Sequence, residues 1–319
     1  MHSRDEIQLM VQVARLYHEN QLNQEEIARR LGITRQKVSR LLIAAKAQGI
    51  VRTVVYDPMP GDPDLGSKLK QRFNLKRVVL AKSDMLEPNQ LRSAIGMAAV
   101  ELLTEKLQDD QIVGIGCGRT LYETINLTRP GVQKRIHVVP LIGGIGDISP
   151  FFQVNELARS LAHAFGGTYR HLYVPAFIED QTVWENLQKT QEVVQASEYW
   201  KRLDIAIVGV GHVEFQHISS MFFASHISAR TLDQLKKSGT VGDICARFFD
   251  IQGNQVFPEI GVTGIDLDRL KTVPEVIGVA GGLEKVRALT GALRGGFLHT
   301  LVTDTATARA ILAETNGRR

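Results

Sequence analysis

The 319-residue sequence lacks the features of membrane and exported proteins. Its longest apolar runs, such as residues 205–210, are much shorter than the roughly 20 residues that a membrane-spanning helix needs. The first ten residues, MHSRDEIQLM, contain two acids before their apolar positions and no small-residue cleavage site, so no secretory signal is expected. We therefore predict a cytoplasmic protein with no membrane partner.

Cysteine is also scarce, with only Cys117 and Cys245 in the chain. Neither their number nor their spacing predicts a disulfide framework or a zinc site, and a reducing compartment is the default. The sequence contains no repeat and no low-complexity tract. Its length suits two domains of roughly 100–200 residues each.

Positive charge is concentrated at the N-terminus. Residues 1–56 contain nine Lys or Arg and five Asp or Glu, whereas the other 263 residues contain 29 of each sign. The net charge of +4 therefore lies in the first sixth of the chain. This asymmetry indicates a polyanionic partner for the N-terminal segment.

Residues 7–18 and 24–31 have the apolar spacing of amphipathic helices. Asn23 and Glu26 match a capping box at the start of the second helix. Gly32 follows that helix and suits a tight turn with positive φ.

A third helix is expected over residues 35–48, with Thr34 as its N-cap and Gly49 as its end. Two helices joined by a short glycine-containing turn are typical of the helix-turn-helix motif. Apolar and polar side chains alternate enough over residues 50–56 to form a strand, as in the winged variant of the helix-turn-helix motif. The predicted core of this unit comprises Ile27, Ala28, Leu31, Ile33, Val38, Leu41 and Leu42.

The polar side chains of the third helix are the candidates for DNA contact. Arginine can bond guanine through two hydrogen bonds, glutamine can read adenine, and serine or lysine can bind phosphate. The candidates are Thr34, Arg35, Gln36, Lys37, Ser39 and Arg40. The alternative is a three-helix protein-interaction module with a solvated basic face.

Three prolines and a glycine within residues 57–63 interrupt both helices and sheets, so this stretch is predicted to be a linker. The predicted domains are residues 1–56 and residues 64–319.

The second domain alternates apolar runs with helical patterns, which predicts an α/β fold with a mostly parallel sheet. The expected helices include residues 90–107, 155–165 and 284–293. A hairpin is expected over residues 242–250, with a further turn at residues 252–254. The candidate strands are residues 78–81, 112–115, 137–142, 168–174, 205–210, 276–280 and 297–302.

Ligands of such sheets bind at the carboxyl ends of the strands. The first candidate strand end contains Gly116, Gly118, Arg119 and Thr120, before a helix expected to begin at Leu121. Glycines and free N–H groups at a helix start favour an anion, and Arg119 adds a charge. The alternative is that the glycines serve tight packing.

Two further strand ends are also rich in glycine. Residues 141–147 place Gly143 and Gly144 after a strand. Gly281 and Gly282 follow another strand and precede Lys285, whose length lets it return to an anion bound at the helix start.

The alternative for Lys285 is a solvated helix lysine. Asp243 follows a glycine in an apolar setting, where its carboxylate could accept two sugar hydroxyls or could cap a turn.

Taken in order along the chain, these motifs resemble the SorC family of sugar-responsive transcription regulators. The resemblance rests on ARLYHENQLNQEEIARRLGITRQKVSRLL, GCGRT, LIGG, VGDICARFFD, GVAGG with Lys285, and LVTDTATARAIL. It implies an effector domain similar to glucosamine-6-phosphate deaminase and ribose-5-phosphate isomerase. It also implies a phosphorylated sugar as effector, and a homotetramer that binds paired, palindromic operator half-sites.

By the same resemblance, Arg119, Thr120 and Lys285 would hold the phosphate and Asp243 the sugar. Position 142 is isoleucine, so no Schiff-base lysine is available there.

The main alternative is a sugar-phosphate isomerase or deaminase with a DNA-binding appendage. Catalysis needs a positioned acid and base, and no histidine lies at a spacing that pairs it with a carboxylate. A dinucleotide cofactor is not expected, because the third glycine of GxGxxG is missing after Gly116. We therefore predict a regulator that is not an enzyme and has no catalytic residue, cofactor or metal.

Overall fold

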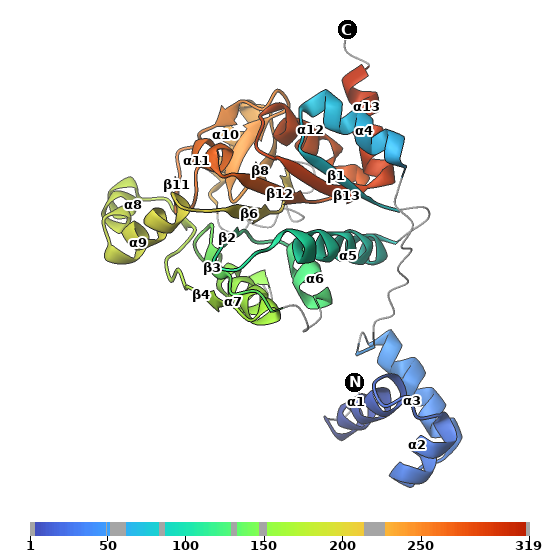
Figure 1. Cartoon of the computed structure of the whole chain (residues 1–319). Helices are drawn as coiled ribbons and strands as arrows, with labels where there is room; N and C mark the ends of the chain where they lie inside the picture. The colour runs from blue at the N-terminus through green and yellow to red at the C-terminus, as the bar shows by residue number, and fades with distance from the viewer. Residues whose placement is uncertain are drawn as a thin grey trace. The chain divides into compact units, whose positions relative to one another are not determined.

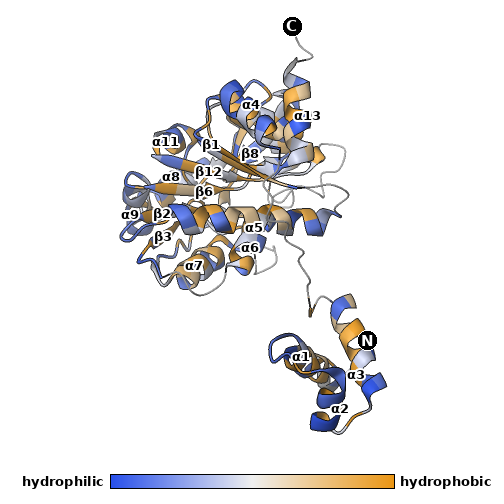
Figure 2. Cartoon of the chain, turned by 45° about the vertical axis from the view of Figure 1, so that its right-hand side comes forward, coloured by the Kyte–Doolittle hydropathy of each residue, from blue (hydrophilic) through white to orange (hydrophobic). Residues whose placement is uncertain are grey.

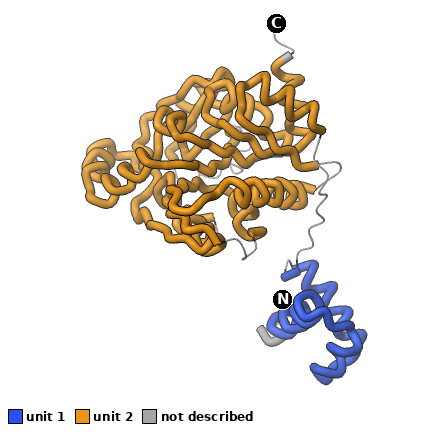
Figure 3. The backbone as a smooth tube through the Cα atoms, in the orientation of Figure 1, with its two compact units in different colours: residues 1–55 blue, residues 56–319 orange. Residues whose placement is uncertain are grey.

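The computed structural model describes residues 4–48, 50–51, 62–82, 87–128, 133–146, 152–213 and 227–316. The chain divides into two compact units, residues 1–55 and residues 56–319 (Figure 3).

The N-terminal unit is a bundle of three helices, α1 (Arg4–His18), α2 (Gln24–Leu31) and α3 (Arg35–Ala47). The capping box is present, since Asn23 accepts from the N–H groups of Glu25 and Glu26 while Glu26 accepts from the N–H of Asn23. Gly32 has the positive φ expected for the turn, +63°. Residues 52–56 of the predicted wing lie outside the described part of the chain.

The core of this unit includes residues from all three helices. Ile27, Val38, Leu41 and Leu42 are buried, and Met10, Val13 and Leu16 of α1 pack against them. The remaining predicted core residues are partly buried at the edge of this cluster.

A seven-stranded parallel sheet forms the centre of the second unit (Figure 1). Its strand order is β1-β13-β12-β6-β2-β3-β4. The prediction of a mostly parallel sheet is confirmed, with each strand at or beside a predicted apolar run. The strands are β1 (Arg77–Ala81), β2 (Ile112–Ile115), β3 (His137–Pro140), β4 (Thr168–Tyr169), β6 (Ile205–Val208), β12 (Glu275–Val279) and β13 (Thr300–Asp304).

Strand β4 is shorter than predicted, because the chain beyond it bonds to side chains. The N–H of Leu172 donates to Asn155 Oδ1 at 2.8 Å, and the N–H of Tyr173 donates to Glu192 Oε1 at 2.6 Å. These bonds replace the predicted sheet ladder at residues 172 and 173, whereas the N–H of Arg170 still donates to the oxygen of Val138 in β3.

Helices cover both faces of the sheet. Figure 1 shows α5 (Pro88–Lys106), α6 (Arg119–Leu127) and α7 (Val154–Phe165) on one side. The helices α4 (Pro63–Phe73), α12 (Val286–Arg294) and α13 (Thr305–Asn316) lie on the other.

Strands β2, β6, β12 and β13 are buried along their whole length, whereas the two residues of β4 at the sheet edge are exposed. Figure 2 shows the hydrophobic colouring of the central strands. In β6, Ile205 and Ile207 are part of the core beneath α5, α6 and α7. Ala206 and Val208 are part of the core on the opposite face of the sheet.

The boundaries of the linker and of the helix predicted over residues 284–293 differ in the structure. Asp62 and Pro63, placed in the linker, are the N-cap and first residue of α4, and residues 57–61 lie outside the description. The helix predicted over residues 284–293 begins as a 3₁₀ turn, η4 (Leu283–Lys285), before α12.

A small antiparallel sheet, in the order β10-β9-β8-β7, packs beside the main one. The predicted hairpin is confirmed, since Cys245 and Ala246 join β8 to β9 with φ of +50° and +60°. The strands are β7 (Gly211–His212), β8 (Thr240–Ile244), β9 (Arg247–Asp250) and β10 (Gln255–Val256).

The other elements were not predicted from the sequence. The pair β5 (Phe177–Ile178) and β11 (Gly261–Val262) is antiparallel. The remaining helices are α8 (Gln181–Gln188), α9 (Gln191–Trp200), α10 (Ala229–Lys237) and α11 (Leu267–Thr272). Among the helices of the described ranges, none combines the length and the hydropathy needed to cross a bilayer.

Candidate ligand-binding site

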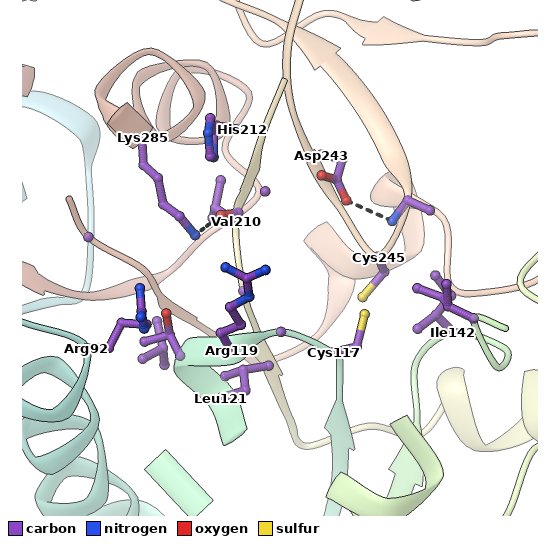
Figure 4. A pocket seen from close by; sticks show the side chains of 18 of the residues that line it. Arg92, Cys117, Arg119, Leu121, Ile142, Val210, His212, Asp243, Cys245 and Lys285 are labelled. Carbon is purple, nitrogen blue, oxygen red and sulfur yellow. Dashed lines mark hydrogen bonds between the residues drawn. The ribbon is translucent and has the colours of Figure 1, made fainter. Parts of the chain in front are cut away.

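A pocket lies at the carboxyl ends of strands β2, β6 and β12 (Figure 4). The segments that follow these strands line it, together with β7 and the β8–β9 hairpin. The main sheet alone does not close this pocket, because Asp243 and Cys245 come from the small antiparallel sheet.

Three cationic side chains line one side of the pocket. Arg92 comes from α5, Arg119 from the first residue of α6, and Lys285 from η4. Lys285 Nζ donates to the carbonyl oxygen of Val210 at 2.7 Å. In Figure 4 the three side chains lie on the side opposite Ile142.

The electrostatic state of Lys285 matches an anion site. Burial is the main reason why the pKa of its amine is lowered, and the charges of Arg92 and Arg119 lower it further. Glu284 and Asp243 act in the opposite direction. A bound anion would supply the negative charge that these clustered cations attract.

The start of α6 adds backbone donors to the cationic side. Gly118 is the N-cap residue with φ of +141°, and the helix begins at Arg119, two residues before the predicted start at Leu121. Thr120 follows and is buried. A helix start exposes N–H groups without intrahelical partners, which favours bound anions.

A single carboxylate lies on the other side of the pocket. Asp243 is 8% exposed, and its Oδ2 accepts a hydrogen bond from the N–H of Ala246 at 3.1 Å. Burial raises the pKa of Asp243 to about 6, partly offset by that hydrogen bond and by the charge of Lys285. Such a carboxylate can accept hydrogen bonds from hydroxyl groups of a ligand.

Six residues of the predicted site line this one pocket. They are Gly118, Arg119, Thr120, Asp243, Gly281 and Lys285. They come from three strand ends that are distant in the sequence.

Gly143 and Gly144 do not line this pocket, and their place in a ligand site stays a prediction. The N–H of Gly143 donates to the carbonyl of Thr263 at 2.9 Å, and a Cβ on Gly143 would lie 2.5 Å from the oxygen of Val174. Gly144 borders a separate depression beside Tyr173. Gly143 permits close packing of the chain, whereas a Cβ on Gly144 would lie 3.8 Å from its nearest neighbours. Asp147 lies outside the described residues.

Gly116 and Gly282 also act through packing instead of lining the pocket. The N–H of Gly116 donates to the oxygen of Ile207 at 2.9 Å. The N–H of Gly282 donates to Asp304 Oδ2 at 3.0 Å and to Thr307 Oγ1 at 2.8 Å. These bonds hold the turns that present Arg119 and Lys285.

The sequence did not identify several lining residues. Arg92 lies in the helix that follows β1 but is eleven residues beyond the predicted strand 78–81, so no strand-end pattern points to it. His212 and Glu284 line the pocket but carried no distinctive spacing, and Cys117 and Cys245 were not predicted to meet. In the described part of the chain, no group of three His, Cys, Asp or Glu side chains could hold a metal ion.

The raised pKa of Asp243 predicts a specific pH dependence of stability. The folded protein keeps this proton to a higher pH than the unfolded chain, whose carboxyl has a pKa near 3.8. The favourable contribution of the protonated group is therefore complete at low pH and is lost as the pH rises through about 6.

We expect the free energy of unfolding of the wild type, relative to that of Asp243→Asn, to fall by about 2–3 kcal/mol between pH 4 and pH 7. Urea unfolding of both proteins across this range measures the difference. A difference that does not change with pH would contradict the placement of a buried carboxyl at this position.

The N-terminal unit presents its predicted DNA-contact residues along α3. Arg35, Gln36, Lys37 and Arg40 are exposed, whereas Ser39 is half-buried. Thr34 is the N-cap, and its Oγ1 accepts from the N–H of Lys37 at 3.2 Å. The buried face of α3 consists of Val38, Leu41, Leu42 and Ala45.

Arg35 also faces Glu25 of α2, with its Nη1 3.6 Å from Glu25 Oε1. Both side chains are mostly exposed, so this pair contributes little to stability. Arg35 therefore remains available for a partner at small cost.

Comparison with known proteins extends over almost the whole chain. Residues 57–313 match the family described as "Putative sugar-binding domain". The sorbitol operon regulator of Klebsiella pneumoniae is 33% identical over 319 residues, which cover 98% of this chain and 100% of that protein. The deoxyribonucleoside regulator of Bacillus subtilis (strain 168) is 32% identical, over 97% of this chain and 98% of its own length.

The fold is shared as well. The crystal structure of the full-length sorbitol operon regulator SorC from Klebsiella pneumoniae superposes with a TM-score of 0.75 at 32% identity, covering 98% of this chain and 100% of that one.

Proposed function

Since the chain belongs to the SorC family of sugar-binding transcriptional regulators, we propose that its pocket binds a phosphorylated sugar that controls DNA binding by the N-terminal unit. The observation that carries the proposal is the division of the pocket. Arg92, Arg119 and Lys285 line one side, and the carboxylate of Asp243 lies on the other.

This division suits a ligand with one anionic end and one hydroxylated end. A phosphate dianion is met by the cations and by the free N–H groups of α6. The sugar hydroxyls then lie toward Asp243, which accepts from them. Position 142 is Ile, so binding through a Schiff-base lysine at that position is not part of the proposal.

A sorbitol operon regulator and a deoxyribonucleoside regulator are among the relatives of this chain, which confirms the prediction of a regulator over that of an isomerase or deaminase. The predicted similarity of the large unit to those enzymes stays a prediction. We further propose a cytoplasmic homotetramer that binds an imperfect palindromic operator. One recognition helix contacts too few base pairs for genomic specificity, and symmetric assemblies read paired half-sites.

A thermal-shift panel of sugar phosphates tests the ligand class. A ligand at 100 times its Kd should stabilise the folded protein by about 2.7 kcal/mol. We expect at least one pentose or hexose phosphate to raise the melting temperature, and its unphosphorylated sugar to have little effect. A panel in which free sugars and sugar phosphates act equally would contradict the phosphate assignment.

The regulatory part has its own test, because linkage is reciprocal. The factor by which the effector changes operator affinity must equal the factor by which operator changes effector affinity. Titration of each ligand with and without the other measures both factors. Equal effector affinity for free and operator-bound protein would exclude control of DNA binding through this pocket.

A further inference from the structure

The only two cysteines of the sequence line the same pocket, although they are far apart along the chain. Cys117 follows β2, and Cys245 lies in the turn between β8 and β9. In Figure 4 their sulfur atoms point toward one another on the Asp243 side of the pocket. Two segments of different sheets thus bring two thiols face to face.

The backbone around the pair is closely packed. A Cβ built on Gly116 would lie 3.1 Å from Cys245 Sγ, so the Cys245 sulfur lies against the residue that precedes Cys117. Cys245 has φ of +50°, a conformation that a non-glycine residue adopts at some cost. The turn therefore holds this sulfur in the pocket wall. Glycine would adopt this backbone conformation at lower cost than cysteine does.

Both groups are thiols in the reduced protein. Burial, and secondly the charge of Asp243, raises the pKa of Cys117 to about 12. Burial also raises the pKa of Cys245 well above its usual value, with Cys117 and Asp243 adding to the rise and Arg247 opposing it. Few thiolates exist at neutral pH, so the pair reacts slowly and is not oxidised by default.

We propose that Cys117 and Cys245 are a modification site, at which a peroxide converts the facing thiols into a disulfide that narrows the Asp243 side of the pocket. One thiol, after losing its proton, attacks a peroxide oxygen, which gives a sulfenic acid and one water. The second thiol then displaces the hydroxyl of the sulfenic acid as a second water and forms the S–S bond. Two hydrogen atoms leave the protein and the peroxide is reduced to two waters.

The consequence for ligand binding follows from the division of the pocket. The disulfide forms beside Asp243 and Ile142, whereas Arg92, Arg119 and Lys285 lie on the opposite side. Oxidation would therefore obstruct the sugar end and leave the anion end intact. This effect on sugar binding rests on the proposed function, whereas formation of the disulfide does not.

The first measurement is chemical and needs no ligand. The full-length protein is treated with hydrogen peroxide at pH 8.5, where more of each thiol is ionised, and is then alkylated and analysed by mass spectrometry. We expect the monomer to lose two hydrogen atoms, to take up no alkylating reagent, and to yield one peptide pair linked through Cys117 and Cys245. Dithiothreitol should restore two alkylatable thiols.

The second measurement compares two probes, inorganic phosphate and ribose 5-phosphate, by thermal shift. Oxidation should change the apparent affinity for inorganic phosphate by no more than about twofold. It should weaken the apparent affinity for ribose 5-phosphate by about tenfold, the loss expected for one hydrogen bond to a charged group. The variants Cys117→Ser and Cys245→Ser, which cannot close the internal bridge, should show no such change with peroxide.

Three results would overturn the proposal. They are two free thiols after prolonged peroxide treatment, a sulfinic acid in place of the linked peptide pair, and a disulfide found only between two chains. If ribose 5-phosphate fails to bind the reduced protein, the choice of ligand has failed, and the mass measurement still decides the disulfide.

Discussion

We expect the Lys285→Met variant to bind the phosphorylated effector about ten- to a hundredfold more weakly than the wild type. Methionine keeps much of the length of the side chain and removes its charge. A charge-assisted hydrogen bond contributes roughly 1.5–3 kcal/mol, and each 1.4 kcal/mol corresponds to a factor of ten in affinity. Isothermal titration with the sugar phosphate that gives the largest thermal shift measures the loss.

The position of Lys285 explains why the effect is expected to be large. Its pKa is lowered chiefly by burial, so the ammonium is partly desolvated before any ligand binds. A bound phosphate then interacts with a charge that water screens poorly. The carbonyl of Val210 already accepts from Nζ and keeps the amine directed into the pocket.

Arg287→Met is the matched control. Arg287 is exposed on α12, two residues from Lys285, and does not line the pocket. The Arg287→Met variant should bind the effector with the affinity of the wild type. The unphosphorylated sugar should bind the wild type and Lys285→Met with equal affinity. If both variants lost affinity equally, general electrostatic attraction and not a specific contact would explain the binding.

The second large effect is expected in DNA recognition. Arg40→Ala should reduce the preference for the operator over unrelated duplex by about ten- to a hundredfold, because a base contact of arginine contributes roughly 1–3 kcal/mol of discrimination. Arg40 is exposed on α3, on the side of the helix away from the buried Val38, Leu41 and Leu42. A binding-site selection with the full-length protein supplies the operator, and fluorescence anisotropy supplies both affinities.

Lys46→Ala provides the comparison, because Lys46 is exposed in the last turn of the same helix. It removes the same charge, so it should weaken both duplexes alike if Lys46 binds phosphate. For each phosphate that the protein no longer neutralises, the slope of log K against log salt should become shallower by about 0.9. A uniform decrease in affinity for both variants would mean that Arg40 binds only the DNA backbone.

The strands of the main sheet were predictable because a parallel sheet covered on both faces needs nearly continuous apolar runs. The run at residues 112–115 coincides with β2, and the other strands lie at or beside their predicted runs. The capping box at Asn23 was also predictable from the sequence, since it depends on two residues only three positions apart. The local apolar pattern gave a wrong prediction where the chain bonds to residues distant in the sequence. This is the case after β4, where the backbone N–H groups donate to the side chains of Asn155 and Glu192.

The pocket was predictable only in part, for the same reason. Arg119 and Lys285 follow strands of the main sheet, and parallel strands bring such ends together. Asp243 comes from the antiparallel sheet, so this rule does not explain its place in the pocket. Arg92 depends on where α5 crosses the sheet, and the meeting of Cys117 with Cys245 depends on how the small sheet packs. Gly143 does not line the pocket, and the nearby oxygen of Val174 gives a packing reason for a glycine at this position.

The place of β13 in the sheet has a consequence for the order in which this protein becomes functional during synthesis. Although β13 comes last along the chain, it lies between β1 and β12, and the carboxylate of Asp304 at its end holds the Gly282 turn that carries Lys285.

The ligand pocket therefore cannot be completed until residues beyond 304 have left the ribosome. The three-helix unit has its own core and does not depend on these residues for its packing. A C-terminally clipped chain would thus keep the three-helix unit and lose the pocket that we propose for the effector.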